Sequence, residues 1–218
     1  MNLSIRFSIL GIAMLLIAGC SKKLQIRLAD TLQNGNITVL NRQISQFPGD
    51  QSAIELNAQI GDGLAIVENL EFNEGEIHIE ILGENNPGKS FVGFAFNIQN
   101  DSTYEVIYFR PFNFVASEKI RKDHMLQYIY HPEYPWHKLR AENTGEFEDE
   151  IINPPNPDLW FNAHIFIEKE KVSVFVNDAK EPSLEVRRLA APVSKKIGLW
   201  TGHGSSGRFR NLKVIPAK

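Results

Sequence analysis

The segment from Tyr104 to Asn113 carries side chains that could bind a sugar. If the apolar residues between them point into a core, Tyr104, Tyr108 and Arg110 share the opposite face of one strand, because side chains alternate between its two faces. A tyrosine ring can stack on a sugar ring, and a guanidinium two residues away can donate paired hydrogen bonds to hydroxyls or to a carboxylate. The alternative is that Arg110 pairs with a neighbouring acid and holds the loop that follows, which contains Asn113.

A second group of candidates lies in the loop from His131 to His137, which leaves a predicted strand and is stiffened by two prolines. Such a loop loses little conformational entropy on binding, so Tyr134 and Trp136 could contact a ligand. His131 could act as a general acid or base, with Glu133 as its orienting partner. The alternative is that Tyr134 and Trp136 close the edge of the fold and that His131 is a solvated loop residue.

Other polar clusters are weaker candidates. Glu76, His78 and Glu80 alternate along one predicted strand, but neighbours two apart are separated by about 7 Å, so the three cannot reach one ion without distortion. His203 lies in the glycine-rich segment 202–207 and is a further candidate for proton transfer. That segment is no phosphate loop, because it lacks the Lys-Ser/Thr pair and no helix is predicted after it. The sequence therefore predicts no metal site and no cofactor, and it leaves a structural or catalytic divalent metal open.

The elements that must position these residues are strands, because apolar and polar residues alternate with a period of two along most of the chain. Asparagine, glycine, proline and aspartate separate the runs and predict turns. Helix is indicated only at 116–122, for one or two turns at most. Many short strands predict an all-β fold, a two-sheet antiparallel jelly-roll sandwich. The clearest strand runs are 76–81, 91–98, 104–110, 126–130, 161–168, 172–176 and 197–201.

The N-terminal segment is expected to be an export signal rather than part of the fold. Residues 1–19 combine one arginine with an apolar run that is too short for a stable membrane span, which needs about 20 residues. The sequence IAGC at 17–20 resembles the lipobox of bacterial lipoproteins, in which the cysteine is acylated and becomes the new N-terminus. We therefore predict a signal peptide over 1–19, a tether over 20–28 after the lipidated Cys20, and one β-sandwich domain over 29–218.

Cysteine content and charge narrow the functional classes. Cys20 is the single cysteine, so the exported domain has no disulfide and no thiol for metal binding or nucleophilic attack. Removal of 1–19 takes away Arg6 and no acid, which leaves 22 basic and 26 acidic residues, a net charge of −4. This balance argues against a nucleic-acid partner, which needs a basic face. The segment after Cys20 lacks the acidic residues of a surface-export signal, which favours the periplasmic face of a membrane over the cell surface.

Several segments resemble a group of Bacteroidetes-type exported proteins in the concanavalin A-like lectin/glucanase superfamily. They are SFVGFAF at 90–96, YFRPFNF at 108–114 and YIYHPEYPW at 128–136. The segments 197–204 and 209–214 are similar to the closing strands of laminin-G-like and 3-keto-disaccharide hydrolase domains, and 158–162 with 172–178 resembles a hairpin common in the superfamily. The resemblance covers about residues 38–216 and implies a jelly roll of two curved sheets, with carbohydrate as the usual ligand. It implies no particular activity, because the superfamily mixes binding modules with enzymes, and the Glu-x-Asp-x-x-Glu motif of its glucanase branch is absent.

Three functions are consistent with these expectations. The first is an envelope-anchored lipoprotein that holds a glycan on the concave sheet. The second is a glycan-processing enzyme, a glycoside or 3-keto-sugar hydrolase or lyase, in which His131 or His203 transfers a proton and Arg110 stabilises negative charge. The third is a protein-interaction lipoprotein without a small ligand. The side chains expected to contact a glycan are Tyr104, Tyr108, Arg110, Asn113, His131, Tyr134 and Trp136.

Overall fold

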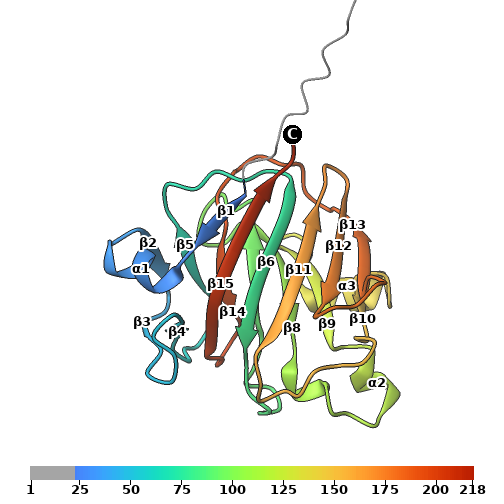
Figure 1. Ribbon diagram of the computed structural model, residues 1–218. Helices are drawn as coiled ribbons and strands as arrows, with labels where there is room; N and C mark the ends of the chain where they lie inside the picture. The colour runs from blue at the N-terminus through green and yellow to red at the C-terminus, as the bar shows by residue number, and fades with distance from the viewer. Residues whose placement is uncertain (1–22) are drawn as a thin grey trace, which may run out of the picture.

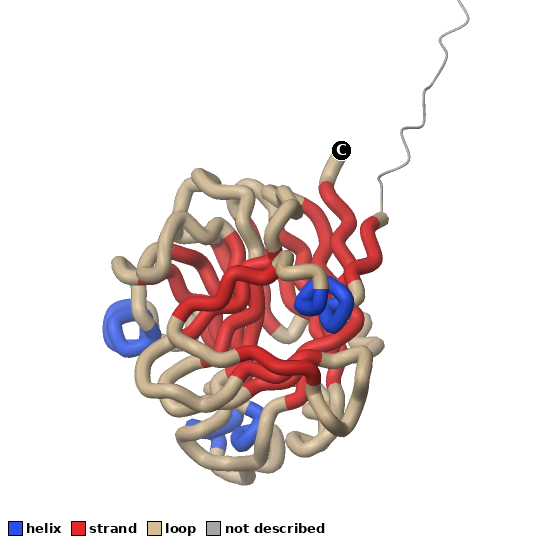
Figure 2. The backbone as a smooth tube through the Cα atoms, turned by 90° about the vertical axis from the view of Figure 1, so that its left-hand side faces the viewer, coloured by secondary structure: helices blue, strands red, loops and turns tan. Residues whose placement is uncertain are grey.

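The computed structural model describes residues 23–218, and most of its elements are strands that form two antiparallel sheets. We call them the front sheet and the back sheet, because the first faces the viewer in Figure 1. Figure 2, turned by 90°, shows the two layers of strands with the short helices at their periphery. The predicted two-sheet antiparallel sandwich is therefore confirmed.

The front sheet has eight strands in the order β13-β12-β11-β6-β15-β4-β3, with β1 paired in addition to β15. Its register shifts once, between Arg210 and Lys213 of β15, where a bulge interrupts the pairing with β6. The strands are β1 (Leu24–Ile26), β3 (Ile44–Gln46), β4 (Ile54–Leu56), β6 (Gly75–Leu82), β11 (Phe161–Ile167), β12 (Lys171–Val176), β13 (Leu184–Arg187) and β15 (Gly207–Pro216).

The back sheet has seven strands in the order β10-β9-β8-β7-β14-β5-β2. Three of these strands, β8, β9 and β14, supply the floor of the cavity described below. The strands are β2 (Ile37–Leu40), β5 (Gly63–Val67), β7 (Val92–Phe96), β8 (Tyr104–Phe109), β9 (Leu126–His131), β10 (Glu148–Asp149) and β14 (Gly198–Thr201).

The helices are short and lie in the connections: α1 (Leu28–Gln33), η1 (Pro111–Asn113), α2 (Lys119–Lys122) and α3 (Trp136–Glu142). α2 falls inside the segment for which the sequence predicts one or two helical turns. α3 was not predicted, because the two prolines before it indicate a stiff loop. Pro135 supplies the extended residue that precedes its first turn, with φ −71° and ψ 161°.

The folded domain begins earlier than the sequence analysis predicts. β1 pairs antiparallel with β15, so that Leu24 lies opposite Val214 and Ile26 opposite Leu212. Leu28, the first residue of α1, is fully buried. These residues therefore belong to the fold rather than to a tether, and the predicted domain boundary at residue 29 is corrected to Leu24.

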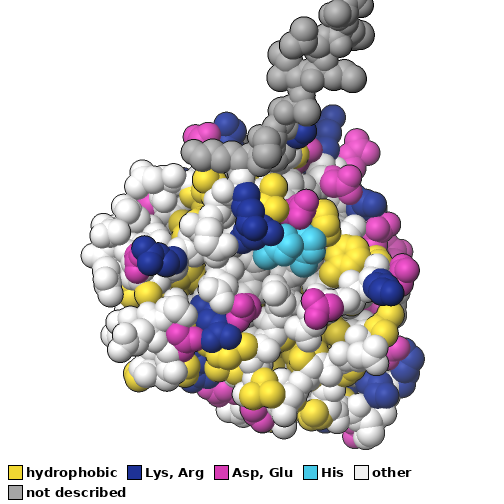
Figure 3. Space-filling model, in the orientation of Figure 1, with side chains coloured by type: hydrophobic (Ala, Val, Ile, Leu, Met, Phe, Trp, Pro, Cys, Tyr) yellow, Lys and Arg dark blue, Asp and Glu magenta, His cyan; other side chains and the backbone are white. Residues whose placement is uncertain are grey.

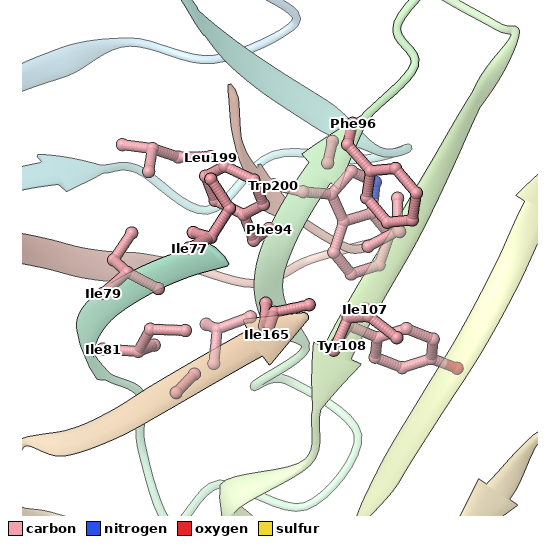
Figure 4. Packing of buried hydrophobic residues seen from close by; sticks show 14 of the residues in the cluster. Ile77, Ile79, Ile81, Phe94, Phe96, Ile107, Tyr108, Ile165, Leu199 and Trp200 are labelled. Atoms are coloured by element: carbon pink, nitrogen blue, oxygen red, sulfur yellow. The ribbon is translucent and has the colours of Figure 1, made fainter. Parts of the chain in front are cut away.

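The core lies between the two sheets and follows from the alternation along each strand. On β6, the side chains of Ile77, Ile79 and Ile81 have no exposed surface. Figure 4 shows them packed with Phe94 and Ile107 from the back sheet. Each fully buried side chain of this kind contributes about 1.5–3 kcal/mol to stability. The alternate residues of the same strands point outward, where they are available to solvent or to a ligand.

Candidate functional site

A cavity of about 630 Å³ lies on the outer face of the back sheet, and we call it the back-sheet cavity. Its floor is formed by outward-facing residues of three strands: Tyr108 of β8, Ile129 of β9 and Trp200 of β14. Its walls come from α3 and from the loops that precede β5 and β7 and that follow β8 and β14. The volume falls within the range of small-molecule sites, about 300–1,000 Å³.

The floor of the cavity is aromatic because a glycine separates two large rings. Gly93 of β7 lies opposite Tyr108 on one side and opposite Trp200 on the other. Without a side chain between them, the two ring centroids are 5.1 Å apart. Phe91 contacts Tyr108 edge-on, with 6.2 Å between centroids. The Nε1 of Trp200 is buried beneath this aromatic surface and has no hydrogen-bond partner among residues 23–218.

Arg110 lines this cavity but is already bonded to the protein. Its Nη1 donates to the carbonyl of His124 at 2.9 Å, and its Nη2 donates to the Tyr108 hydroxyl at 2.6 Å and to Oε1 of Gln127. Its guanidinium lies 4.8 Å from the centroid of the Tyr108 ring and 3.7 Å from Glu148. This geometry matches the alternative in which Arg110 pairs with an acid and holds the following loop. Burial raises the pKa of Tyr108 to about 12, so this phenol is neutral at pH 7.

One end of the cavity holds a group of titratable side chains. Nε2 of His131 lies 3.6 Å from Oδ2 of Asp62, and the hydroxyl of Tyr104 lies 3.4 Å from the same oxygen. Nδ1 of His203 accepts a hydrogen bond from the backbone N–H of Gly61 at 3.2 Å. Burial raises the pKa of Asp62 and lowers the pKa of His131, while the charge of each opposes the shift of the other.

Another part of the rim is formed by α3. Trp136, its first residue, is 47% exposed, so a large part of its ring is open to solvent beside the cavity. The guanidinium of Arg140 lies 5.0 Å from the ring centroid of Trp136. Arg140 in turn donates two hydrogen bonds to the carboxylate of Glu148, at 2.8 and 2.6 Å. This bidentate pair holds the helix against the edge of the back sheet.

The structure brings most of the predicted site residues together. Tyr108, Arg110, Asn113, His131, Trp136 and His203 line the back-sheet cavity, and Tyr104 reaches it through Asp62. Tyr134 does not line it and instead stacks with Tyr130, with 6.3 Å between ring centroids. Glu133 is exposed outside the cavity, so the carboxylate beside His131 is Asp62 rather than the predicted partner.

Several residues of the cavity were not predicted from the sequence. Asp62 lies in a glycine-flanked turn without any local pattern, and Trp200 was interpreted as core packing. Trp200 is buried as expected, but the pairing with Gly93 places it on the outer face of the back sheet. Phe91, His124 and Arg140 are among the other residues that the sequence did not indicate.

Two parts of the prediction concern the membrane. The signal segment 1–19 and the lipidation site Cys20 lie outside the described residues. Within residues 23–218, no helix combines the length and the hydropathy that a bilayer span requires.

Comparisons with known proteins define the class of fold. No protein-family model matches the chain, and no curated protein matches it in sequence. Solved structures with the same architecture include the carbohydrate binding module CBM66 from Bacillus subtilis, with a TM-score of 0.58, 10% identity, and coverage of 82% of this chain and 94% of that one.

Two further structures show the same likeness. A Bacillus subtilis protein of unknown function with a galectin-like fold has a TM-score of 0.59 and 14% identity, over 88% of this chain and 94% of that one. A protein from Parabacteroides distasonis ATCC 8503, provisionally classed as a glycosyl hydrolase, has a TM-score of 0.53 and 12% identity, over 89% and 94%. At these identities the likeness defines the fold alone. The chain has the fold of a two-sheet, lectin-like jelly-roll sandwich.

Proposed function

We propose that this protein binds a carbohydrate in the back-sheet cavity. The observation that carries the proposal is the aromatic surround of a cavity of about 630 Å³, with Phe91, Tyr108, Trp136 and Trp200 in its lining. Aromatic rings offer flat apolar surfaces for the C–H faces of a sugar, and a few polar groups among them fix its orientation. The fold supports the proposal, because CBM66 is by its name a carbohydrate binding module.

The polar groups of the cavity suit hydroxyl ligands better than a single strong charge. The donors of Arg110 and Arg140 are engaged by protein acceptors, as described above. The side chains of Asn113 and His203 line the cavity as well and can donate or accept hydrogen bonds. A sugar hydroxyl can donate to one such group and accept from another, so these groups suit a neutral or weakly charged sugar.

Binding can be tested by screening the protein on a glycan array and titrating the hits by calorimetry. Replacing Trp136 by alanine removes an exposed ring at the rim and is expected to weaken binding about tenfold or more. Trp160→Ala is the matched control, because Trp160 lies outside the cavity, with the guanidinium of Arg210 4.3 Å from its ring centroid. Equal losses in the two variants, or no glycan bound at any concentration tested, would contradict the proposal.

A catalytic role is the second candidate, and the pair of His131 and Asp62 favours it. A histidine whose pKa is lowered by burial is neutral at pH 7 and can accept a proton, and a carboxylate 3.6 Å away can orient it. The substrate would be an oligosaccharide or a 3-keto-sugar, as the sequence resemblance implies. His131→Gln and Asp62→Asn are then expected to abolish cleavage of such sugars while the array binding persists. Absence of cleavage by the unaltered protein would leave the binding function alone.

We further propose that a lipid on Cys20 holds the domain at the periplasmic face of a membrane. The support is the apolar segment 1–19 followed by the lipobox-like sequence, as described above. Two or more acyl chains anchor a protein stably, whereas one gives only marginal binding. Cys20→Ser is expected to move the protein from the membrane fraction to the soluble fraction and to stop labelling by a fatty acid. Membrane retention and labelling of that variant would refute the anchor.

A further inference from the structure

The outer face of the front sheet carries a second cluster of polar side chains, far from the back-sheet cavity. Glu76 and His78 point outward from β6, and His164 points outward from β11 directly opposite His78. Figure 3 shows the histidine atoms of this face as one patch open to solvent, with a basic group on one side and apolar side chains on the other. The exposed fractions of the three side chains are 35%, 24% and 24%.

Three potential metal ligands converge in this cluster. Oε2 of Glu76 lies 3.3 Å from Nε2 of His78 and 3.1 Å from Nε2 of His164. The two imidazole rings are stacked, with 3.6 Å between centroids and 21° between planes. One ligand atom from each residue lies within 4.8 Å of the other two.

The two distances from Glu76 are close to the edge length of a tetrahedral metal site. Zinc binds imidazole nitrogen and carboxylate oxygen at about 2.0–2.2 Å, so neighbouring ligand atoms lie about 3.3 Å apart. We propose that Glu76, His78 and His164 form a three-ligand site for a divalent transition-metal ion such as Zn²⁺. The fourth position faces solvent, which allows a water molecule or a group from outside to complete the coordination.

This cluster differs by one residue from the triad of Glu76, His78 and Glu80, which lies on a single strand and cannot reach one ion. Glu80, the third residue of that triad, is engaged by the side chains of Arg210 and Asn211 at 2.6 and 2.7 Å. The place that it would have taken is occupied by His164, which comes from the neighbouring strand. A cross-strand pair brings side chains closer together than residues two apart on one strand.

Packing and burial both act on the two histidines of the cluster. The ring of His164 packs against Phe166 and Phe175, with centroids 4.2 and 6.0 Å apart, so its orientation is fixed by contact on one side and by His78 on the other. Burial lowers the pKa of both histidines, so both are neutral and able to coordinate at pH 7. Imidazole with a carboxylate suits Zn²⁺, Cu²⁺ or Ni²⁺ better than Ca²⁺, which prefers oxygen ligands only.

The positive charge of one neighbouring residue opposes metal binding at this cluster. Lys213 of β15 lies opposite His78 in the sheet register, and its ammonium lowers the pKa of both histidines in addition to the effect of burial. The same cation repels a bound metal ion. Removal of this charge is therefore expected to strengthen metal binding, whereas removal of a ligand weakens it.

The proposal can be tested by titrating the metal-free protein with Zn²⁺ in a non-chelating buffer at pH 7.5, followed by calorimetry. We expect one ion per chain, with affinity reduced about tenfold or more in Glu76→Gln and in His164→Gln. The matched control is Glu80→Gln, which makes the same change of charge four residues further along β6, on the same outer face. Lys213→Gln is expected to bind Zn²⁺ more tightly than the unaltered protein.

The titrations of the variants distinguish Zn²⁺ binding at this cluster from Zn²⁺ binding to other groups of the protein. Binding that is unchanged in Glu76→Gln and in His164→Gln would place the ion elsewhere, for example on the histidines of the back-sheet cavity, and would overturn the proposal. Lack of any Zn²⁺ binding would overturn it as well. If His164→Gln does not fold, Glu76→Gln and Lys213→Gln decide the question, because both residues are partly exposed and their replacements are close in size.

Discussion

The guanidinium of Arg188 and the carboxylate of Glu105 form a bidentate ion pair in the interior, with Nη2–Oε2 and Nε–Oε1 distances of 2.6 and 3.0 Å. Both side chains are almost completely buried. Tyr128 donates a hydrogen bond to Oε1 of Glu105 at 2.6 Å, and Asn97 donates one to Oε2 at 2.7 Å. The pair joins β8 to the segment that follows β13, so it connects the back sheet to the front sheet by polar contacts within an otherwise apolar interior.

Replacing Glu105 by glutamine is expected to lower the free energy of unfolding by about 3–5 kcal/mol, because the charge of Arg188 would remain buried without a counter-ion. Urea denaturation followed by circular dichroism measures the change. Glu185→Gln is the control, because the pair of Glu185 with Lys171 is exposed and should contribute little. Similar midpoints for the two variants would show that the interior pair does not have this role.

Gly93 is expected to be essential to the aromatic floor of the cavity. A Cβ at this position would lie 2.1 Å from the carbonyl oxygen of Ile107 and 2.7 Å from Cα of Tyr108, and the backbone of β8 cannot move away without breaking the sheet. Gly93→Ala should therefore destabilise the protein by about 1–3 kcal/mol and weaken any glycan binding in the cavity. Thermal unfolding and the glycan titration measure the two effects.

Gly35→Ala provides the comparison for this prediction, because Gly35 lies outside the cavity. Gly35 has a φ of +70° and no atom within 4 Å of an added Cβ, so the only cost is left-handed backbone strain of about 1–2 kcal/mol. The glycan affinity of this variant should be closer to that of the unaltered protein than the affinity of Gly93→Ala is. Retention of full affinity in Gly93→Ala would mean that the contact between Tyr108 and Trp200 is not needed for binding.

The stability of the protein is expected to fall as the pH falls below about 6.5. Burial lowers the pKa of His78 and His164 in the folded protein, so the unfolded chain binds more protons between the unfolded and folded pKa values. The stability associated with neutral His78 and His164 is therefore fully present above about pH 6.5. It is lost as the pH falls through the pKa values of these histidines in the folded protein. Melting temperatures measured from pH 8 to 5 with EDTA present should show a smaller decline in His164→Gln, and an equal decline would refute this assignment.

Zinc is expected to stabilise the protein by mass action. At a free concentration ten times the dissociation constant, binding to the folded state alone adds about 1.4 kcal/mol to the free energy of unfolding. The melting temperature should rise on addition of Zn²⁺ and return to its starting value with EDTA, whereas Glu76→Gln should show almost no shift. A lower melting temperature on addition of Zn²⁺ would indicate stronger binding to the unfolded chain.

Local patterns in the sequence were sufficient to predict the two-sheet sandwich and the side chains on one face of β8. Alternation alone places Tyr104, Tyr108 and Arg110 on the same side of β8, and the structure has them there. The hydrogen bonds that occupy Arg110 could not be predicted, because Gln127 and His124 reach it through the pairing of β8 with β9.

The other groups of the two sites depend on contacts between distant segments. Asp62 and Trp200 join the cavity because β14 lies between β5 and β7 in the sheet order. His164 joins Glu76 across 88 positions of sequence, through the register of β6 with β11. Strand order and register arise from packing of the whole chain, and no single segment encodes them.

The pairing of β1 with β15 also sets how far the domain could stand from a bilayer. With a lipid on Cys20, only the chain from Cys20 to Leu24 would connect the membrane to the first strand, a reach of at most about 14 Å when fully extended. That reach is less than half the thickness of a hydrocarbon core, about 30 Å. Such a short connection would keep the sandwich close to the lipid head groups. The glycans that the domain could then bind would be those that lie along the membrane surface.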